Sequence, residues 1–157
     1  MRPKKLPNVL DEDEQEKLLE QPNPRYVTGQ RNRALLRLML DTGLRLSEMA
    51  TLRWRELDLN TGRLEVKQGK GGKDRILWVP EDCLEELREW RTRQAGEAGK
   101  SLEYVFTSMS AGALGNPVSR RYVQDMVPRY AKKAGIEKRV TPHTLRHYVE
   151  KKIMVSV

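Results

Sequence analysis

An amphipathic stretch in the first third of the chain places the strongest constraint on the fold. Between Arg31 and Asp41, apolar residues recur at the three- and four-residue spacing of one helical face. This face consists of Leu35, Leu36, Leu38, Met39 and Leu40, and the arginines Arg31, Arg33 and Arg37 are expected to lie outside it. Gly43 follows, and glycine readily adopts the left-handed conformation that ends a helix. We therefore expect a helix that packs one side against a core and stops at Gly43.

Other helices are predicted on both sides of this stretch. Asp11–Glu14 has the pattern of a capping box, and its acids suit the positive end of a helix dipole. The remaining predicted helices cover Leu46–Leu52, Glu81–Ala95 (with Leu84, Leu87 and Trp90 inward, and the chain loosening over Gly96–Lys100), and Ser119–Ala134. Pro128 lies inside the last of these, where an interior proline removes a hydrogen bond, so we expect a bend or two shorter helices there.

A change from helical spacing to strict alternation marks a β-region. Arg63–Lys67 alternates polar and apolar residues, as a half-buried strand does, and Ile76–Val79 is predicted to return beside it. The glycine-rich turn Gln68–Lys73 joins the two. The predicted fold class is therefore α+β, a mainly helical domain that carries a small antiparallel β-sheet.

The charge of the chain favours a polyanionic partner. The formal net charge is +8 and the isoelectric point is about 9.7. Ser119–His147 contains eight lysines and arginines and two acids, whereas Glu81–Glu103 contains seven acids and four bases. This asymmetry predicts one basic face, as a protein that binds a nucleic-acid groove requires.

Composition also argues against several classes of protein. Cys83 is the only cysteine, so neither an intramolecular disulfide nor a zinc site of several thiolates can form. No apolar run is long enough to span a bilayer, and the first residues lack the apolar core of a signal peptide. We expect an intracellular protein that is not inserted in a membrane.

The segment Thr141–His147 combines residues that suit phosphate chemistry. Thr141 and Pro142 are typical of the start of a helix, and the three-residue spacing of His143 and Arg146 places them on one face. A guanidinium binds two oxygens at once and an imidazole moves protons. An ordinary helix of a basic protein can carry the same residues. A metal site at His143 and His147 is disfavoured, because Thr144 stands where zinc proteases of this spacing have glutamate and Arg146 would oppose a cation.

Two more stretches add cations to this set. Arg45 follows Gly43 at the junction of two predicted helices, where it could bind phosphate or form a surface salt bridge with Glu48. Lys70 lies in the glycine-rich turn, where the glycines allow the backbone to approach DNA closely and the lysine side chain could reach a leaving-group oxygen. Such a turn is more often a solvated hairpin tip when nothing else accompanies it.

Together, T-G-L-R-L-S-E at 42–48, H-T-L-R-H at 143–147 and G-K-G-G-K-D-R at 69–75 resemble the motifs of the tyrosine recombinases, the phage integrase and Xer-like family. The resemblance implies that Arg45 and Arg146 bind the scissile phosphate, that Lys70 protonates the leaving 5′-oxygen and that His143 assists proton transfer. His147 matches a further histidine of the family, and Glu48 matches the acid that supports the first arginine. Lys73, Arg75, Arg120 and Arg121 are then candidates for DNA contacts.

The resemblance also implies a reaction and partners. A tyrosine attacks the phosphate, forms a 3′-phosphotyrosyl link and is later displaced, without metal or cofactor. The implied partners are duplex DNA and other recombinase protomers, and the implied location is the cytoplasm, at the nucleoid.

The family's nucleophile lies well beyond its second arginine motif, and only residues 147–157 follow Arg146. Tyr148 is expected to pack rather than to attack, so the nucleophile is unknown. We expect a basic arm at 1–8 and an incomplete catalytic domain at 9–157, without the N-terminal DNA-clamping domain and without the nucleophile segment, and therefore inactive alone. Two alternatives remain open: a non-catalytic DNA-binding or regulatory module, and a nucleophile supplied in trans by a partner.

Overall fold

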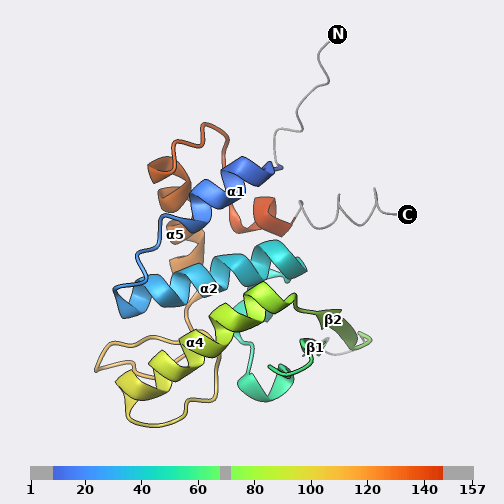
Figure 1. The fold of residues 1–157 in the computed structure, drawn as a ribbon, viewed down its shortest axis with the longest axis vertical. Helices are drawn as coiled ribbons and strands as arrows, with labels where there is room; N and C mark the ends of the chain where they lie inside the picture. Colours follow the sequence, from blue (N-terminus) through green and yellow to red (C-terminus); the bar gives the residue numbers. More distant parts are fainter. Residues whose placement is uncertain (1–8, 68–71, 147–157) are drawn as a thin grey trace.

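The computed structural model of the chain describes residues 9–67 and 72–146 (Figure 1). Its elements in chain order are α1 (Glu12–Leu19), α2 (Val27–Thr42), α3 (Leu46–Ala50), the short 3-10 helix η1 (Trp54–Glu56), β1 (Arg63–Val66), β2 (Arg75–Trp78), α4 (Glu81–Ala98) and α5 (Arg120–Lys133). Residues 142–146 are also helical. The predicted class, a mainly helical α+β fold with a small antiparallel sheet, is confirmed. No helix among the described residues combines the length and apolar character needed to cross a bilayer.

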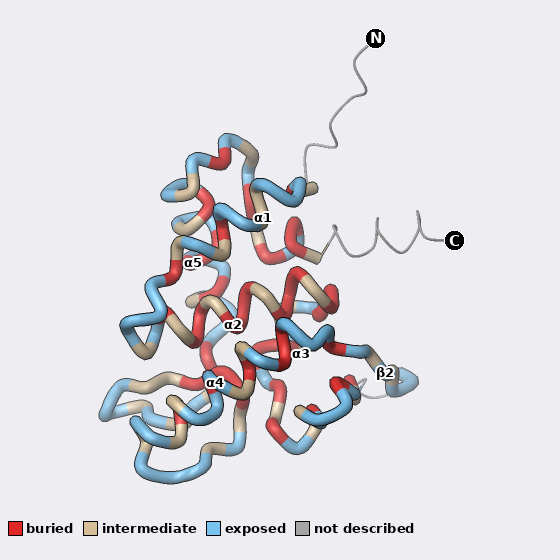
Figure 2. Tube along the Cα trace, viewed as in Figure 1, coloured by how far each residue is buried: buried red, intermediate tan, exposed pale blue. Residues whose placement is uncertain are grey.

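The central element is α2, which packs against α1 on one side and α4 on the other (Figures 1 and 2). Its leucines and Met39 are almost completely buried, as the predicted apolar face requires. The helix begins four residues earlier than the amphipathic pattern indicated and ends at Gly43, whose φ of 69° is left-handed. Near its start, a Cβ on Gly29 would lie 1.8 Å from the carbonyl oxygen of Asn23, so this close approach requires glycine.

The expectation that Arg31 lies outside the buried face of α2 is wrong. Arg31 is only 4% exposed, and its guanidinium donates to the carbonyl of Thr107 at 3.0 Å and to the Tyr122 hydroxyl at 2.8 Å. The ring of Tyr122 lies 5.0 Å from the guanidinium carbon. Because the loop at Thr107 and helix α5 cover this side of α2, a face that looks solvated in the sequence becomes an interior polar contact.

Helix α1 begins at the predicted capping box. The Asp11 side chain accepts from the backbone N–H of Glu14 at 2.8 Å, and the Glu14 side chain accepts from the N–H of Asp11 at 3.1 Å. Glu14 also accepts from Lys138 Nζ at 2.7 Å. This ion pair joins the first helix to the segment that precedes residues 142–146.

Helix α4 is confirmed but is longer than predicted. Leu84, Leu87 and Trp90 are buried, and the Trp90 indole donates to the carbonyl of Val105 at 2.7 Å. The helix continues through Gly96 and ends at Gly99, so the expected loosening at Gly96 is wrong. Gly99 has a φ of 73°, and this left-handed conformation rather than the glycine at 96 ends the helix.

The two strands form the predicted antiparallel sheet. Leu64 pairs with Leu77 and Val66 pairs with Arg75, so the buried side chains of β1 lie on one face. The turn at 68–71, which includes Lys70, lies outside the described residues.

Helix α5 is a single helix through Pro128, so the alternative of two shorter helices is wrong. Ser119 caps it by accepting from the N–H of Tyr122 at 3.0 Å. Pro128 has no N–H, so the carbonyl of Gln124 lacks the hydrogen bond that a helix would give it. Gln124 and Pro128 are both exposed.

Candidate phosphate-binding site

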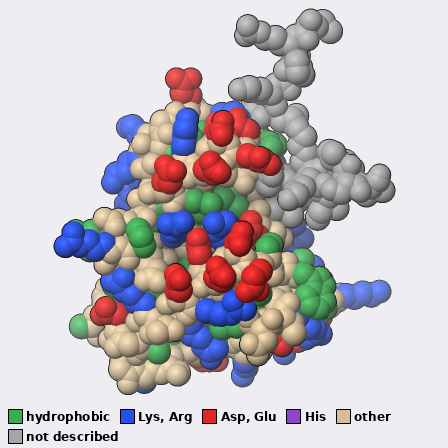
Figure 3. Space-filling model, in the orientation of Figure 1, with side chains coloured by type: hydrophobic (Ala, Val, Ile, Leu, Met, Phe, Trp, Pro, Cys, Tyr) green, Lys and Arg blue, Asp and Glu red, His purple; other side chains and the backbone are tan. Residues whose placement is uncertain are grey.

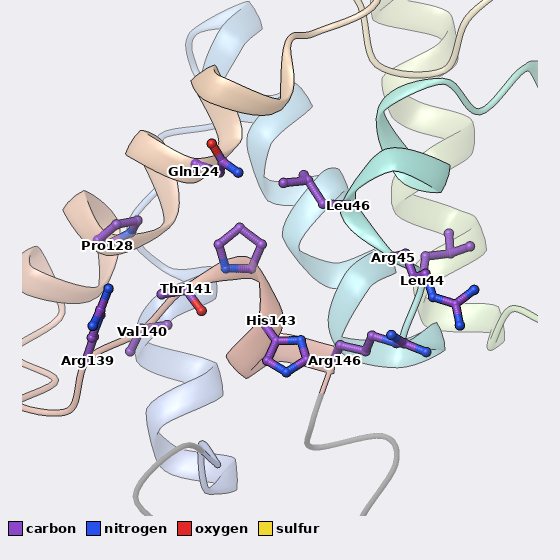
Figure 4. Close-up of a pocket in the computed structure, with 11 residues that line it drawn as sticks. Leu44, Arg45, Leu46, Gln124, Pro128, Arg139, Val140, Thr141, His143 and Arg146 are labelled. Carbon is purple, nitrogen blue, oxygen red and sulfur yellow. The ribbon is translucent and has the colours of Figure 1, made fainter.

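A cavity of about 660 Å³ lies where α3, α5 and residues 139–146 meet. Its lining includes Arg45, Leu46, Gln124, Arg139, His143 and Arg146. Figure 4 shows the side chains of Arg45 and Arg146 lying beside each other at one end and Arg139 at the other. We call this the arginine cavity.

The helix start predicted at Thr141 is confirmed and holds His143 and Arg146 in place. Residues 142–146 are helical, and the N–H of Thr141 donates to the Thr144 hydroxyl at 3.1 Å. Leu145 is completely buried and Thr144 nearly so. Because these side chains anchor the segment in the core, His143 is left exposed and Arg146 half-buried, both lining the cavity.

A single backbone carbonyl orients the second arginine beside the first. The Nε of Arg146 donates to the carbonyl oxygen of Gly43 at 3.0 Å, across 103 positions of the sequence. Gly43 is the left-handed residue that ends α2, and Arg45 lies two positions later, at the N-cap of α3. The end of α2 therefore brings together two guanidinium groups that are far apart in the chain.

Glu48 holds the backbone of Arg45 and binds a second arginine. Its carboxylate accepts from the N–H of Arg45 at 2.9 Å, and one of its oxygens lies 3.5 Å from Arg45 Nη1. The same carboxylate accepts from both terminal nitrogens of Arg75, at 2.6 and 2.8 Å. The two-pronged ion pair, the strongest geometry available to a carboxylate, thus belongs to Arg75 and not to Arg45.

These contacts shift the pKa values of the pair. Burial by itself would raise the pKa of the Glu48 carboxyl, but the hydrogen bonds from Arg75 and from the N–H of Arg45, with the charges of both guanidinium groups, lower it below its ordinary value. The hydrogen bonds to Glu48 outweigh burial at Arg75 and raise its pKa. Both groups are therefore charged at neutral pH.

The other predicted DNA contacts lie outside the cavity lining. Lys73 is exposed, and Arg75 is half-buried against Glu48. Arg120 and Arg121 are exposed in the first turn of α5, where Arg121 pairs with Asp125 at 3.3 Å. The face shown in Figure 3 carries acidic side chains over α1 and α4, interspersed with lysines and arginines.

Four residues of the cavity wall were not predicted from the sequence: Gln124, Pro128, Arg139 and Val140. Gln124 and Pro128 lie one helical turn apart on α5, and Arg139 precedes the segment 142–146. The four-residue spacing of Gln124 and Pro128 places them on one helix face, and this signal was available in the sequence. However, the sequence around these residues does not indicate that this helix face lies opposite Arg45.

The arrangement suits an anion. Arg45 and Arg146 present two guanidinium groups to one cavity, and His143 adds an imidazole that can exchange a proton. Among the described residues no cluster of three or more histidine, cysteine or acidic side chains could hold a metal ion. Lys70, His147 and Tyr148 lie outside the described residues, so their predicted placement stays a prediction.

The fold is that of recombinase catalytic domains. The crystal structure of XerA recombinase superimposes with a TM-score of 0.81 at 29% identity, over 99% of this chain and 52% of that one. The XerH site-specific recombinase bound to its difH substrate gives a TM-score of 0.77 at 26% identity, over 99% of this chain and 45% of that one. The lambda integrase catalytic core gives 0.68 at 21% identity, over 95% of this chain and 84% of that one, which supports the fold.

Sequence comparison leads to the same family. The family model described as "Phage integrase family" matches residues 8–155. Tyrosine recombinase XerC of Xanthomonas campestris pv. campestris (strain B100) is 42% identical over 98% of this chain, and XerC of Thermodesulfovibrio yellowstonii is 37% identical over 90%. The chain belongs to the phage integrase family. It spans about half the length of the curated relatives that it matches, 45% and 47% for these two.

Proposed function

We propose that this chain is the DNA-binding catalytic portion of a site-specific tyrosine recombinase, in which Arg45 and Arg146 bind the scissile phosphate. The observation that carries the proposal is the contact between Arg146 Nε and the Gly43 carbonyl, which sets the second guanidinium beside the first in one cavity. The relative XerH, similar over nearly the whole of this chain, has been crystallised on its DNA substrate. The proposed partners are accordingly duplex DNA and further protomers, at the nucleoid in the cytoplasm.

In the proposed reaction, a tyrosine hydroxyl attacks the phosphorus and loses its proton, while the bond to the 5′-oxygen breaks and that oxygen gains a proton. Arg45 and Arg146 stabilise the charge that develops on the non-bridging oxygens. His143 assists proton transfer at the same phosphate. The family resemblance assigns the proton of the leaving oxygen to Lys70. The described lining of the arginine cavity contains no tyrosine, and the nucleophile stays unassigned.

The first test measures DNA affinity as a function of salt. Duplexes that bind the protein would be selected from a random pool, and affinity would be measured by fluorescence anisotropy for Arg45→Ala and Arg146→Ala. Each variant should weaken binding and lower the slope of log affinity against log salt by about 1, the value for one lost phosphate contact. Arg91→Ala is the control, because Arg91 is exposed on α4 and stacks on Trp54. Equal behaviour of all three variants would contradict the proposal.

Covalent trapping addresses the reaction itself. The selected duplex, carrying a nick so that the cleaved strand diffuses away, would be mixed with the protein and examined on a denaturing gel for a DNA adduct. An adduct that depends on Arg45 and Arg146 supports recombinase chemistry, and its mapped residue identifies the nucleophile. Binding that depends on both arginines without an adduct favours the DNA-binding module or a nucleophile from a partner.

A further inference from the structure

The carboxylate of Glu48 lies between two arginines that compete for it. Arg75 donates both terminal nitrogens to it, at 2.6 and 2.8 Å, whereas Arg45 Nη1 is 3.5 Å from its nearer oxygen. The Glu48 side chain is 13% exposed, Arg75 is 30% exposed and Arg45 is 49% exposed. One guanidinium is therefore committed to the carboxylate, and the other is turned toward solvent and the arginine cavity.

We propose that Arg75 is a positioning residue that neutralises Glu48 and so keeps the Arg45 guanidinium available for phosphate. This inference rests on the proposed function, in which Arg45 binds the scissile phosphate. It replaces the expectation that Arg75 itself contacts DNA phosphate, because both terminal nitrogens of Arg75 are directed at Glu48 and Arg75 does not line the arginine cavity.

The competition follows from the local geometry of α3. Glu48 is fixed three residues after Arg45, because its carboxylate accepts from the N–H of Arg45 at 2.9 Å. This contact keeps the carboxylate within reach of the Arg45 side chain, whose Nη1 lies 3.5 Å from it. Without Arg75, the guanidinium nearest to this partly buried negative charge is that of Arg45, and a carboxylate that binds one arginine through two hydrogen bonds strongly favours that pairing.

In the absence of Arg75, Arg45 would therefore be paired with Glu48 and unavailable to phosphate. A phosphate would have to displace an intramolecular carboxylate from Arg45, and affinity would fall even though no phosphate contact had been removed. Arg75 prevents this by occupying Glu48 from β2, the strand that follows the glycine-rich turn. The position of the hairpin is thereby linked to the availability of Arg45.

The decisive experiment is rescue by a second substitution. Affinity for the selected duplex would be measured for Arg75→Ala, Glu48→Gln and the double variant, with Arg45→Ala as reference. Glutamine keeps an acceptor for the N–H of Arg45 and removes the negative charge. Arg75→Ala should weaken binding about tenfold, and the double variant should recover to within about threefold of Glu48→Gln alone. A double variant as weak as Arg75→Ala would overturn the proposal and assign Arg75 a direct DNA contact.

A conservative variant guards against a simple loss of folding. Arg75→Lys retains the charge beside Glu48 but can make only one strong hydrogen bond, so its affinity should lie within about threefold of the unmodified protein. If Arg75→Lys binds as weakly as Arg75→Ala although both unfold at the same urea concentration as the parent, charge neutralisation is not the role of Arg75.

A measurement without DNA separates this inference from the proposed function. In ¹⁵N NMR spectra of the arginine side chains, the Arg45 guanidinium should be slowed and shifted in Arg75→Ala, as expected on pairing with Glu48, and should return to its parent signal in the double variant. An unchanged Arg45 signal in Arg75→Ala would overturn the inference. If instead capture of Arg45 is seen but Arg45→Ala leaves DNA affinity unchanged, the proposed function fails and the competition for Glu48 stands.

Discussion

The pKa of a single side chain in this protein depends on the partners that the fold places beside it. For Glu48, this dependence should be visible in how the stability of the protein changes with pH. Its pKa lies below the ordinary 4.5, because the hydrogen bonds from Arg75 and the N–H of Arg45 outweigh burial. A carboxyl whose pKa is lower in the folded than in the unfolded protein stabilises the fold at pH values above its unfolded-state pKa. That contribution is lost as the pH falls through its folded-state pKa.

Glu48→Gln should therefore lower the free energy of unfolding by a constant amount above about pH 5, and the difference from the parent should shrink as pH falls below 4.5. Urea titrations between pH 3 and pH 7 measure this difference. Glu16→Gln, at an exposed position of α1, is the control for loss of an acid. A difference that persists unchanged to pH 3 would show that the charge of Glu48 contributes nothing to folding.

The buried guanidinium of Arg31 leads to a second prediction at this scale. Burial lowers its pKa, although the Tyr122 hydroxyl acts in the opposite direction, and its hydrogen bonds satisfy Thr107 and Tyr122. Arg31→Met should cost about 2–4 kcal/mol of unfolding free energy, since the buried Thr107 carbonyl and Asn32 side-chain oxygen lose the hydrogen bonds that Arg31 donates, whereas the Tyr122 hydroxyl keeps one from Asn32. Arg33→Met, two residues along α2 and 39% exposed, should cost less than about 1 kcal/mol. Equal losses in chemical denaturation would refute the interior role of Arg31.

Among the elements, the two long helices that end in left-handed glycines offer a matched pair. Gly43 ends α2 with a φ of 69° and Gly99 ends α4 with a φ of 73°. Alanine at either position should cost about 1 kcal/mol, because a side chain disfavours this conformation. Only Gly43→Ala disturbs the carbonyl that holds Arg146, so only this variant should also weaken DNA binding. Thermal unfolding and anisotropy together test the pair, and a DNA defect in Gly99→Ala would contradict the assignment.

Helix α5 shows what local pattern can and cannot predict about an element. Its start at Ser119 and its end before Gly135 follow from capping residues, and both were predicted. Pro128 was expected either to bend the helix or to divide it into two. The helix is not divided, and its interior side is formed by Val123, Met126 and Val127. Tertiary packing on both sides of the proline outweighs one missing hydrogen bond, a balance that no local rule contains.

For the whole molecule, the distribution of charge predicts how DNA binding depends on salt. Arg120→Ala and Arg121→Ala each remove one cation from α5, in the basic segment 119–147. Each should lower the slope of log affinity against log salt concentration by up to about 1, without changing stability. Lys100→Ala, exposed beyond the acidic helix α4, should leave the slope unchanged. Affinities measured between about 50 and 200 mM salt decide this. A slope that changes only with Lys100 would place the DNA on the other face.

The sequence by itself determined the helices, the hairpin and the apolar faces of α2 and α4, because periodicity, capping residues and turn glycines act over a few neighbouring positions. The two arginine motifs were identified by their resemblance to a known family. Leu35, Leu87 and Trp90 were predicted to be inside on the basis of periodicity and are buried. Only the tertiary structure decided which polar groups meet. Arg31 is buried against residues that are 76 and 91 positions away in the sequence. Glu48 pairs with Arg75, 27 positions away, and Arg146 donates to the carbonyl of Gly43, 103 positions away. Such pairings depend on how whole helices pack, and a local pattern carries no record of that packing.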